Sequence, residues 1–187
     1  MRSPRNNPFP SGVVAALIPA LWSLACSIPP SNATITLGDL PSETTMEWNP
    51  VADYLGHRCG ALDCHGDVQR NFIIWSCDGL RLSPVDGAVA ISGCDMGEKT
   101  TAAEYLATYR SLVGLEPVPM SEVVAGGGAD PDLLTFVRKA RGEEAHKGGQ
   151  LIDLTTQVGI TQDDCITSWL SGNTNAMDCT QAIDLTQ

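Results

Sequence analysis

Apolar residues recur every three or four positions in four stretches of the chain, which is the period of an amphipathic helix. Asn49 and Pro50 are expected to start the first of these helices, and Asp130 and Pro131 the third, because asparagine and aspartate cap helices and proline suits the first turn. The predicted helices cover residues 46–60, 98–117, 131–140 and 161–173.

The segments between these helices are short apolar runs or polar loops. Residues 67–95 contain "NFIIWSCDGLRLSP" and "GAVAISGC", bounded by Gly, Asp and Pro, which predicts short strands or extended loops. Residues 143–150, "EEAHKGGQ", predict a loop with a histidine at its centre. The fold class that follows is mainly α, a small helical domain with long loops and one extended excursion.

The N-terminal part predicts export. Arg2 and Arg5 precede an apolar run at 13–25, which is too short to span a bilayer but suits the hydrophobic region of a signal peptide. Cys26 follows "SLA", a context similar to a bacterial lipoprotein box, so this cysteine is a candidate for lipidation; plain secretion is the alternative. We therefore expect a signal peptide at 1–26, a linker at 27–45 rich in Pro, Ser and Thr, and a domain at 46–187.

The balance of acidic and basic residues makes some classes of binding partner unfavourable. The chain has 22 acidic and 11 basic residues, a formal net charge of −11, which disfavours nucleic acid and electrostatic docking to anionic lipid. Only 5 % of the residues are aromatic, while glycine and proline are abundant. A domain with many loops and a small core needs further stabilisation, which disulfides or a large buried cofactor can supply.

Six cysteines remain after the leader, and an exported protein meets an oxidising compartment in which free thiols are uncommon. We therefore expect them to be paired with each other or with a cofactor. They are Cys59, Cys64, Cys77, Cys94, Cys165 and Cys179.

Two of these cysteines lie in the motif "CGALDCHG" at 59–66, which follows the first predicted helix. A second segment, "LLTFVRKARGEEAHKGG" at 133–149, also contains a histidine near glycines. Together they resemble a single-haem cytochrome c-type domain of a bacterial exported protein, over roughly residues 46–173. The four-residue spacer between the cysteines departs from the two residues that are common in this family.

The resemblance implies a covalently attached c-type haem, in which the thiols of Cys59 and Cys64 add across the two vinyl groups. His65 would then be the proximal iron ligand, and His146 the distal ligand, with Met120 as the alternative. The family's crossing of first and last helices would bring the region of Tyr54 against Trp169.

The implied function is one-electron transfer in the periplasm or at the outer membrane of a Gram-negative bacterium. A redox partner protein with a basic face would dock on the acidic surface. The protein would be an electron carrier or a binding module rather than an enzyme, and neither "GxSxG" nor "HExxH" occurs in the sequence.

With Cys59 and Cys64 on haem, four cysteines remain, and four allow three connectivities. The local pairing, expected on this interpretation, joins Cys77 to Cys94 and Cys165 to Cys179.

Two alternatives stay open. The first is a haem-free binding or structural lipoprotein, derived from a cytochrome fold, with a third disulfide between Cys59 and Cys64. The second is a zinc site formed by His57, Cys59, Cys64 and His65, all of which are good zinc ligands.

Overall fold

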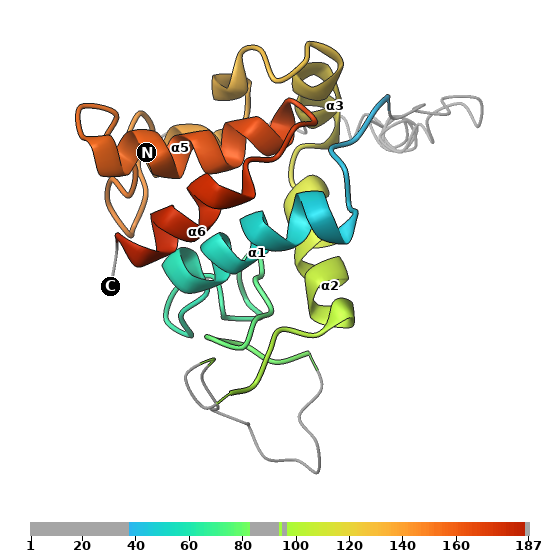
Figure 1. Cartoon of the computed structure of the whole chain (residues 1–187), viewed down its shortest axis with the longest axis vertical. Helices are drawn as coiled ribbons and strands as arrows, with labels where there is room; N and C mark the ends of the chain where they lie inside the picture. The colour runs from blue at the N-terminus through green and yellow to red at the C-terminus, as the bar shows by residue number, and fades with distance from the viewer. Residues whose placement is uncertain (1–37, 83–93, 95–96, 186–187) are drawn as a thin grey trace, which may run out of the picture. The chain divides into compact units, whose positions relative to one another are not determined.

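A computed structural model describes residues 38–82, 94 and 97–185. Within them the chain forms six α-helices and no strand, so the prediction of a mainly α domain is confirmed (Figure 1). The elements are α1 (Thr45–Cys59), α2 (Ala102–Val113), α3 (Pro117–Ala125), the 3-10 turn η3 (Pro131–Leu133), α4 (Thr135–Arg141), α5 (Gln157–Leu170) and α6 (Ala176–Asp184).

The core forms where α1 packs against α2, α5 and α6, and Figure 1 shows α6 lying beside α1. Its centre is aromatic. The ring centroid of Trp48 on α1 lies 4.8 Å from that of Trp169 on α5 and 5.5 Å from that of Tyr109 on α2. The first helix and the Trp-bearing helix therefore do pack together, and the contact is made at Trp48, near the start of α1.

The packed domain begins earlier than the expected boundary at residue 46. The hydroxyl of Tyr109 donates to the carbonyl of Pro41 at 2.6 Å, and the indole N–H of Trp169 donates to the carbonyl of Ser42 at 2.9 Å. The last part of the expected linker is thus attached to the core. The predicted signal peptide, with Cys26, lies outside the described residues.

The start of α1 differs from the prediction. The helix begins at Thr45, and the carbonyl of Thr44 accepts hydrogen bonds from the backbone N–H groups of Glu47 and Trp48. Pro50 therefore lies inside the helix, and the prediction that Asn49 and Pro50 start it was wrong. The helix tolerates the lost hydrogen bond because burial of Trp48, which is 1 % exposed, stabilises its first turn against the core.

The segment that contains Met120 is the helix α3. Pro117 and Pro119 lie in the first turn of α3, where backbone N–H groups have no partner within the helix, so proline costs little there. Met120 is 1 % exposed and packs in the core.

The third predicted helix is divided into η3 and α4, and the side chain of Asp130 does not cap it. Asp130 has a left-handed backbone, with φ of 53°. The carboxylate of Glu116 supplies the acceptors for α4 instead: its two oxygens accept from the backbone N–H and the hydroxyl of Thr135, both at 2.6 Å. A cap supplied from a distant segment could not be read from local spacing. Gly142, with φ of 76°, ends α4.

The excursion at 67–95 contains no strand in its described part, residues 67–82 and 94. A single bridge between Trp75 and Leu80 is the only extended pairing there. Residues 83–93, which include most of "GAVAISGC", lie outside the described residues.

Both local disulfides are present in the structure, Cys77–Cys94 and Cys165–Cys179. The second joins α5 to α6, a helix that the sequence patterns did not indicate. Among the described residues, no helix is long and apolar enough to cross a membrane.

Replacing both Cys165 and Cys179 by alanine should lower the free energy of unfolding by about 3 kcal/mol, because the bridge closes a short loop and both sulfurs are buried. Urea unfolding of the oxidised protein measures this loss. A double variant as stable as the native chain would show that the bridge does not hold α6 on the core.

Candidate functional site

The Cys–Cys–His motif forms a compact loop at the C-terminal end of α1. Cys59 is the last residue of the helix, and its carbonyl accepts from the backbone N–H of His65 at 3.0 Å. The carbonyl of Ala61 accepts from the N–H groups of Cys64 and Gly66, at 2.8 and 3.0 Å. The four-residue spacer is therefore folded back on itself, which brings the second cysteine and the histidine to the end of the helix.

Neighbouring segments hold this loop in place. The guanidinium of Arg70 donates to the carbonyls of Cys64 and Asp63, each at 3.1 Å, and the N–H of Ile74 donates to the carbonyl of His65 at 2.8 Å. Gly66 and Gly79 both lie so close to the carbonyl oxygen of Gly60 that a Cβ atom on either would clash with it. The loop is thus fixed by packing as well as by hydrogen bonds.

Cys59 and Cys64 are not bridged in the structure. Cys64 is exposed, whereas Cys59 is partly buried, and burial raises the pKa of its thiol to about 12. In the haem-free alternative these two sulfurs would form the third disulfide.

The different surroundings of the two thiols have a measurable consequence in the haem-free, reduced chain. We expect iodoacetamide to modify Cys64 at least about tenfold faster than Cys59, because only the thiolate reacts and the buried thiol rarely ionises. Peptide mass spectrometry after brief labelling resolves the two sites. Equal labelling would contradict the placement of Cys59.

His65 and His146 lie together, although they are far apart in the sequence. His146 belongs to the loop that follows α4, and its ring centroid is 6.0 Å from that of His65, with the two ring planes only 20° apart. A nitrogen ligand lies about 2 Å from a transition metal ion, so two imidazoles on opposite sides of one ion have centroids about 6 Å apart. The observed centroid separation of the two stacked rings equals this distance.

Each ring is held by its Nδ1 atom. His65 Nδ1 lies 2.9 Å from the carbonyl oxygen of Phe72, and His146 Nδ1 lies 3.2 Å from that of Gly149. A carbonyl only accepts, so Nδ1 carries the proton in both rings and Nε2 keeps its lone pair for a metal. Burial, above all, lowers the pKa of His65, which keeps its ring neutral near pH 7.

Two cavities adjoin this histidine pair, with volumes of about 440 and 550 Å³. His65, Arg70, Lys139 and His146 line both of them. The first is mainly apolar and extends toward the core; its apolar lining is formed by Leu55, Phe72, Leu115, Phe136, Ala140, Ile152 and Ile166. The second contains Cys59 and Cys64, and we call it the polar cavity because charged residues are more frequent in its lining.

These surroundings fit a c-type haem. The cofactor needs two unbridged thiols at one edge, imidazole nitrogens on its faces, an apolar enclosure for the macrocycle, and cations near its carboxylates. Cys59 and Cys64, the pair of His65 and His146, the apolar cavity and the basic side chains of the polar cavity supply these features. The remaining candidate ligand, Met120, lines neither cavity.

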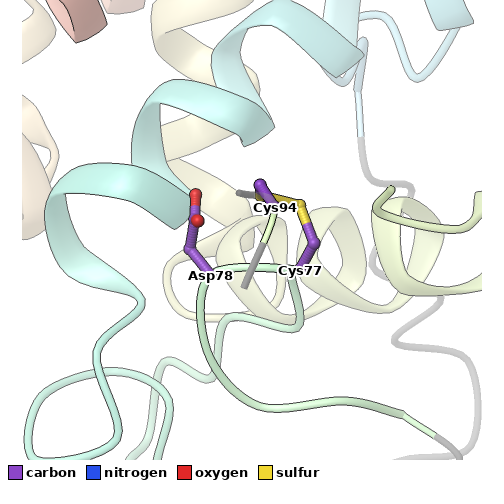
Figure 2. Close-up of side chains that lie close together, drawn as sticks. All are labelled: Cys77, Asp78 and Cys94. Atoms are coloured by element: carbon purple, nitrogen blue, oxygen red, sulfur yellow. A yellow bond between two sulfur atoms is a disulfide. The ribbon is translucent and has the colours of Figure 1, made fainter. Parts of the chain in front are cut away.

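The four residues of the proposed zinc site do not come together in the structure. Nδ1 of His57 lies 3.9 Å from a carboxylate oxygen of Asp78, which is outside the motif loop. In the described part of the chain, three potential ligand atoms come within 4.8 Å of one another only at Cys77, Asp78 and Cys94 (Figure 2). Both of those sulfurs are used in the disulfide, as Figure 2 shows, so they are not thiolate ligands.

Sequence patterns missed several residues of the site. Arg70 braces the motif loop from the following segment, Phe72 supplies the carbonyl for His65, and Lys139 lies between the two cavities. The only sequence signal for any of them was the position of Lys139 in the segment that ends near His146.

Comparison of the chain with protein-family models, with curated proteins and with solved structures found no match.

Proposed function

We propose that this protein is an exported electron-transfer protein that carries one c-type haem, attached to Cys59 and Cys64 and bound by His65 and His146. The observation that carries the proposal is the pairing of His65 with His146, whose ring centroids lie 6.0 Å apart. Both histidines line two cavities, and the polar cavity also contains both free thiols.

The residues of the chain have separate roles in this proposal. The carbonyls of Phe72 and Gly149 hold the two imidazoles in the tautomer that presents Nε2. Burial lowers the pKa of His65, which reduces competition between a proton and the metal for that ring. Arg70 fixes the motif loop through two backbone carbonyls, so that the thiols and His65 keep their mutual geometry.

The surroundings of the pair favour electron transfer over catalysis of a reaction. The bound haem supplies one-electron chemistry, and its redox potential depends on the axial ligands and on burial. His65 and His146 would both hold the haem iron, which would leave no coordination position for a substrate, and the chemistry that the group would supply is one-electron transfer.

Export and a lipid anchor complete the proposal. The apolar run at 13–25 and the cysteine after "SLA" support a location in the periplasm or at the outer membrane. Such a compartment also suits the disulfides Cys77–Cys94 and Cys165–Cys179.

A haem stain after denaturing electrophoresis tests the attachment. The full chain and the variant C59A/C64A are exported from a host with haem-attachment machinery. The native chain should keep its stain in detergent and the variant should lose it completely, because only thioether bonds survive denaturation. A C77A/C94A variant is the control, since it also loses two cysteines yet keeps the motif. An unstained native chain would contradict the proposal.

A further inference from the structure

A further cavity, of about 730 Å³, adjoins the disulfide Cys77–Cys94 and is also lined by residues of α1 and α2. Among the described residues, it shares no lining residue with the two cavities beside His65. Three of its described lining residues carry carboxylates and one is a lysine. A cavity lined mainly by negative charge attracts cations.

Four potential metal ligands meet at this cavity. One carboxylate oxygen of Asp78 and the sulfurs of Cys77 and Cys94 lie within 4.8 Å of one another (Figure 2). Nδ1 of His57 lies 3.9 Å from a carboxylate oxygen of Asp78, and these two side chains are 30 % and 31 % exposed. The ligand atoms of a tetrahedral zinc ion are about 3.3 to 3.8 Å apart. Once the bond between the sulfurs is broken, small side-chain movements are therefore enough to place these atoms around one ion.

This disulfide is also the more accessible of the two. Cys94 is partly exposed, and the hydroxyl of Thr100 donates to Sγ of Cys77 at 3.3 Å. Thiol–disulfide exchange is faster at an accessible sulfur and when the departing thiolate is stabilised. Cys165 and Cys179 are both 0 % exposed. A reductant should therefore open Cys77–Cys94 first.

We propose that Cys77, Cys94 and Asp78, with His57 as the fourth ligand, form a zinc site that opens when a dithiol reduces the Cys77–Cys94 disulfide. One thiolate of the dithiol attacks Sγ of Cys94, the bond between the two protein sulfurs breaks, and Cys77 leaves as a thiolate that takes up a proton. The second thiol of the dithiol then displaces Cys94. The dithiol ends as a disulfide and the protein as two thiols, whose two protons are released when Zn²⁺ binds.

This site goes beyond the proposed function and does not depend on haem. Of the zinc site suggested by the sequence it keeps only His57. An ion that binds only the reduced form favours that form, so bound zinc opposes the return of the disulfide. The zinc content of the site thus follows the redox state of Cys77 and Cys94.

Zinc titration of the full exported chain tests the site. The chain is reduced briefly with dithiothreitol and freed of it without oxygen, and peptide mapping establishes that Cys165–Cys179 is intact. Zn²⁺ is then titrated against a chromophoric indicator. We expect the reduced chain to bind one Zn²⁺ more than the oxidised chain, and one more than a C77A/C94A variant treated in the same way, which measures binding by other thiols.

Single substitutions identify the remaining ligands while both cysteines stay in place. D78N and H57Q should bind Zn²⁺ at least about tenfold more weakly, because even changes beside a metal site cost that much. D39N is the matched control: Asp39 is exposed and lies outside the cavity, so the affinity should change less than about twofold.

Three results would overturn the inference. The first is equal zinc binding by the reduced native chain and the C77A/C94A variant. The second is a loss in D78N or H57Q no larger than that in D39N. The third is a cobalt(II) complex of the reduced chain without thiolate-to-metal charge-transfer absorption beyond that of C77A/C94A.

Discussion

Replacing His146 by alanine should open one coordination position and change the protein from one that does not bind carbon monoxide to one that binds it stoichiometrically. The reason is geometric: His146 is the imidazole that faces His65, and among the described residues no other candidate ligand lines the two cavities beside the pair. Visible spectra of the reduced protein with and without carbon monoxide measure the change, and the midpoint potential should rise when an imidazole is lost.

Two control variants separate this assignment from its rivals. H57A should leave the spectrum unchanged, because His57 lies beside Asp78 and outside both cavities next to His65. M120L should also keep the spectrum, because Met120 is packed in the core. Carbon monoxide binding by M120L, together with an unchanged spectrum in H146A, would show that methionine is the sixth ligand after all.

Replacing Trp169 by alanine should destabilise the domain by about 3 to 5 kcal/mol. The indole is 0 % exposed, contacts Trp48, and donates its N–H to the carbonyl of Ser42. The change therefore empties the centre of the core and releases the segment before α1. Chemical unfolding followed by circular dichroism gives the loss directly.

A Trp169→Phe variant distinguishes packing from hydrogen bonding at this position. It keeps a smaller aromatic ring in the core and removes the donor to Ser42, so we expect a loss of about 1 to 2 kcal/mol, well below that of W169A. If W169A were no less stable than W169F, the aromatic centre would not be what holds α1 and α5 together.

The helical part of the fold was largely predictable, and the errors have local causes. The apolar period indicated α1, α2, α4 and α5, because each buries one face against the core. Two prolines misled the prediction: Pro50 lies inside α1 instead of starting it, and Pro117, where the second predicted helix ends, starts α3. At Pro50, packing of the neighbouring residues against the core outweighs the preference of proline for the first turn of a helix.

The sequence predicted the candidate site only where cysteine and histidine residues lie close together or beside glycines. "CGALDCHG" drew attention to Cys59, Cys64 and His65, and the glycine-flanked loop to His146. The proximity of His65 and His146 depends on how the loop after α4 packs against the end of α1. This is a tertiary contact, which local sequence patterns do not predict. Arg70 and Phe72, which hold the motif loop and the ring of His65, carry no local signature in the sequence.

The intact mass of the mature protein, measured without reducing agent after export from a host with haem-attachment machinery, tests the central claim most directly. Our account predicts a mass raised by one haem, with two disulfides, Cys77–Cys94 and Cys165–Cys179. A colourless chain, lighter than its reduced form by the hydrogens of three disulfides, would mean that Cys59 and Cys64 are bridged to each other and would contradict it.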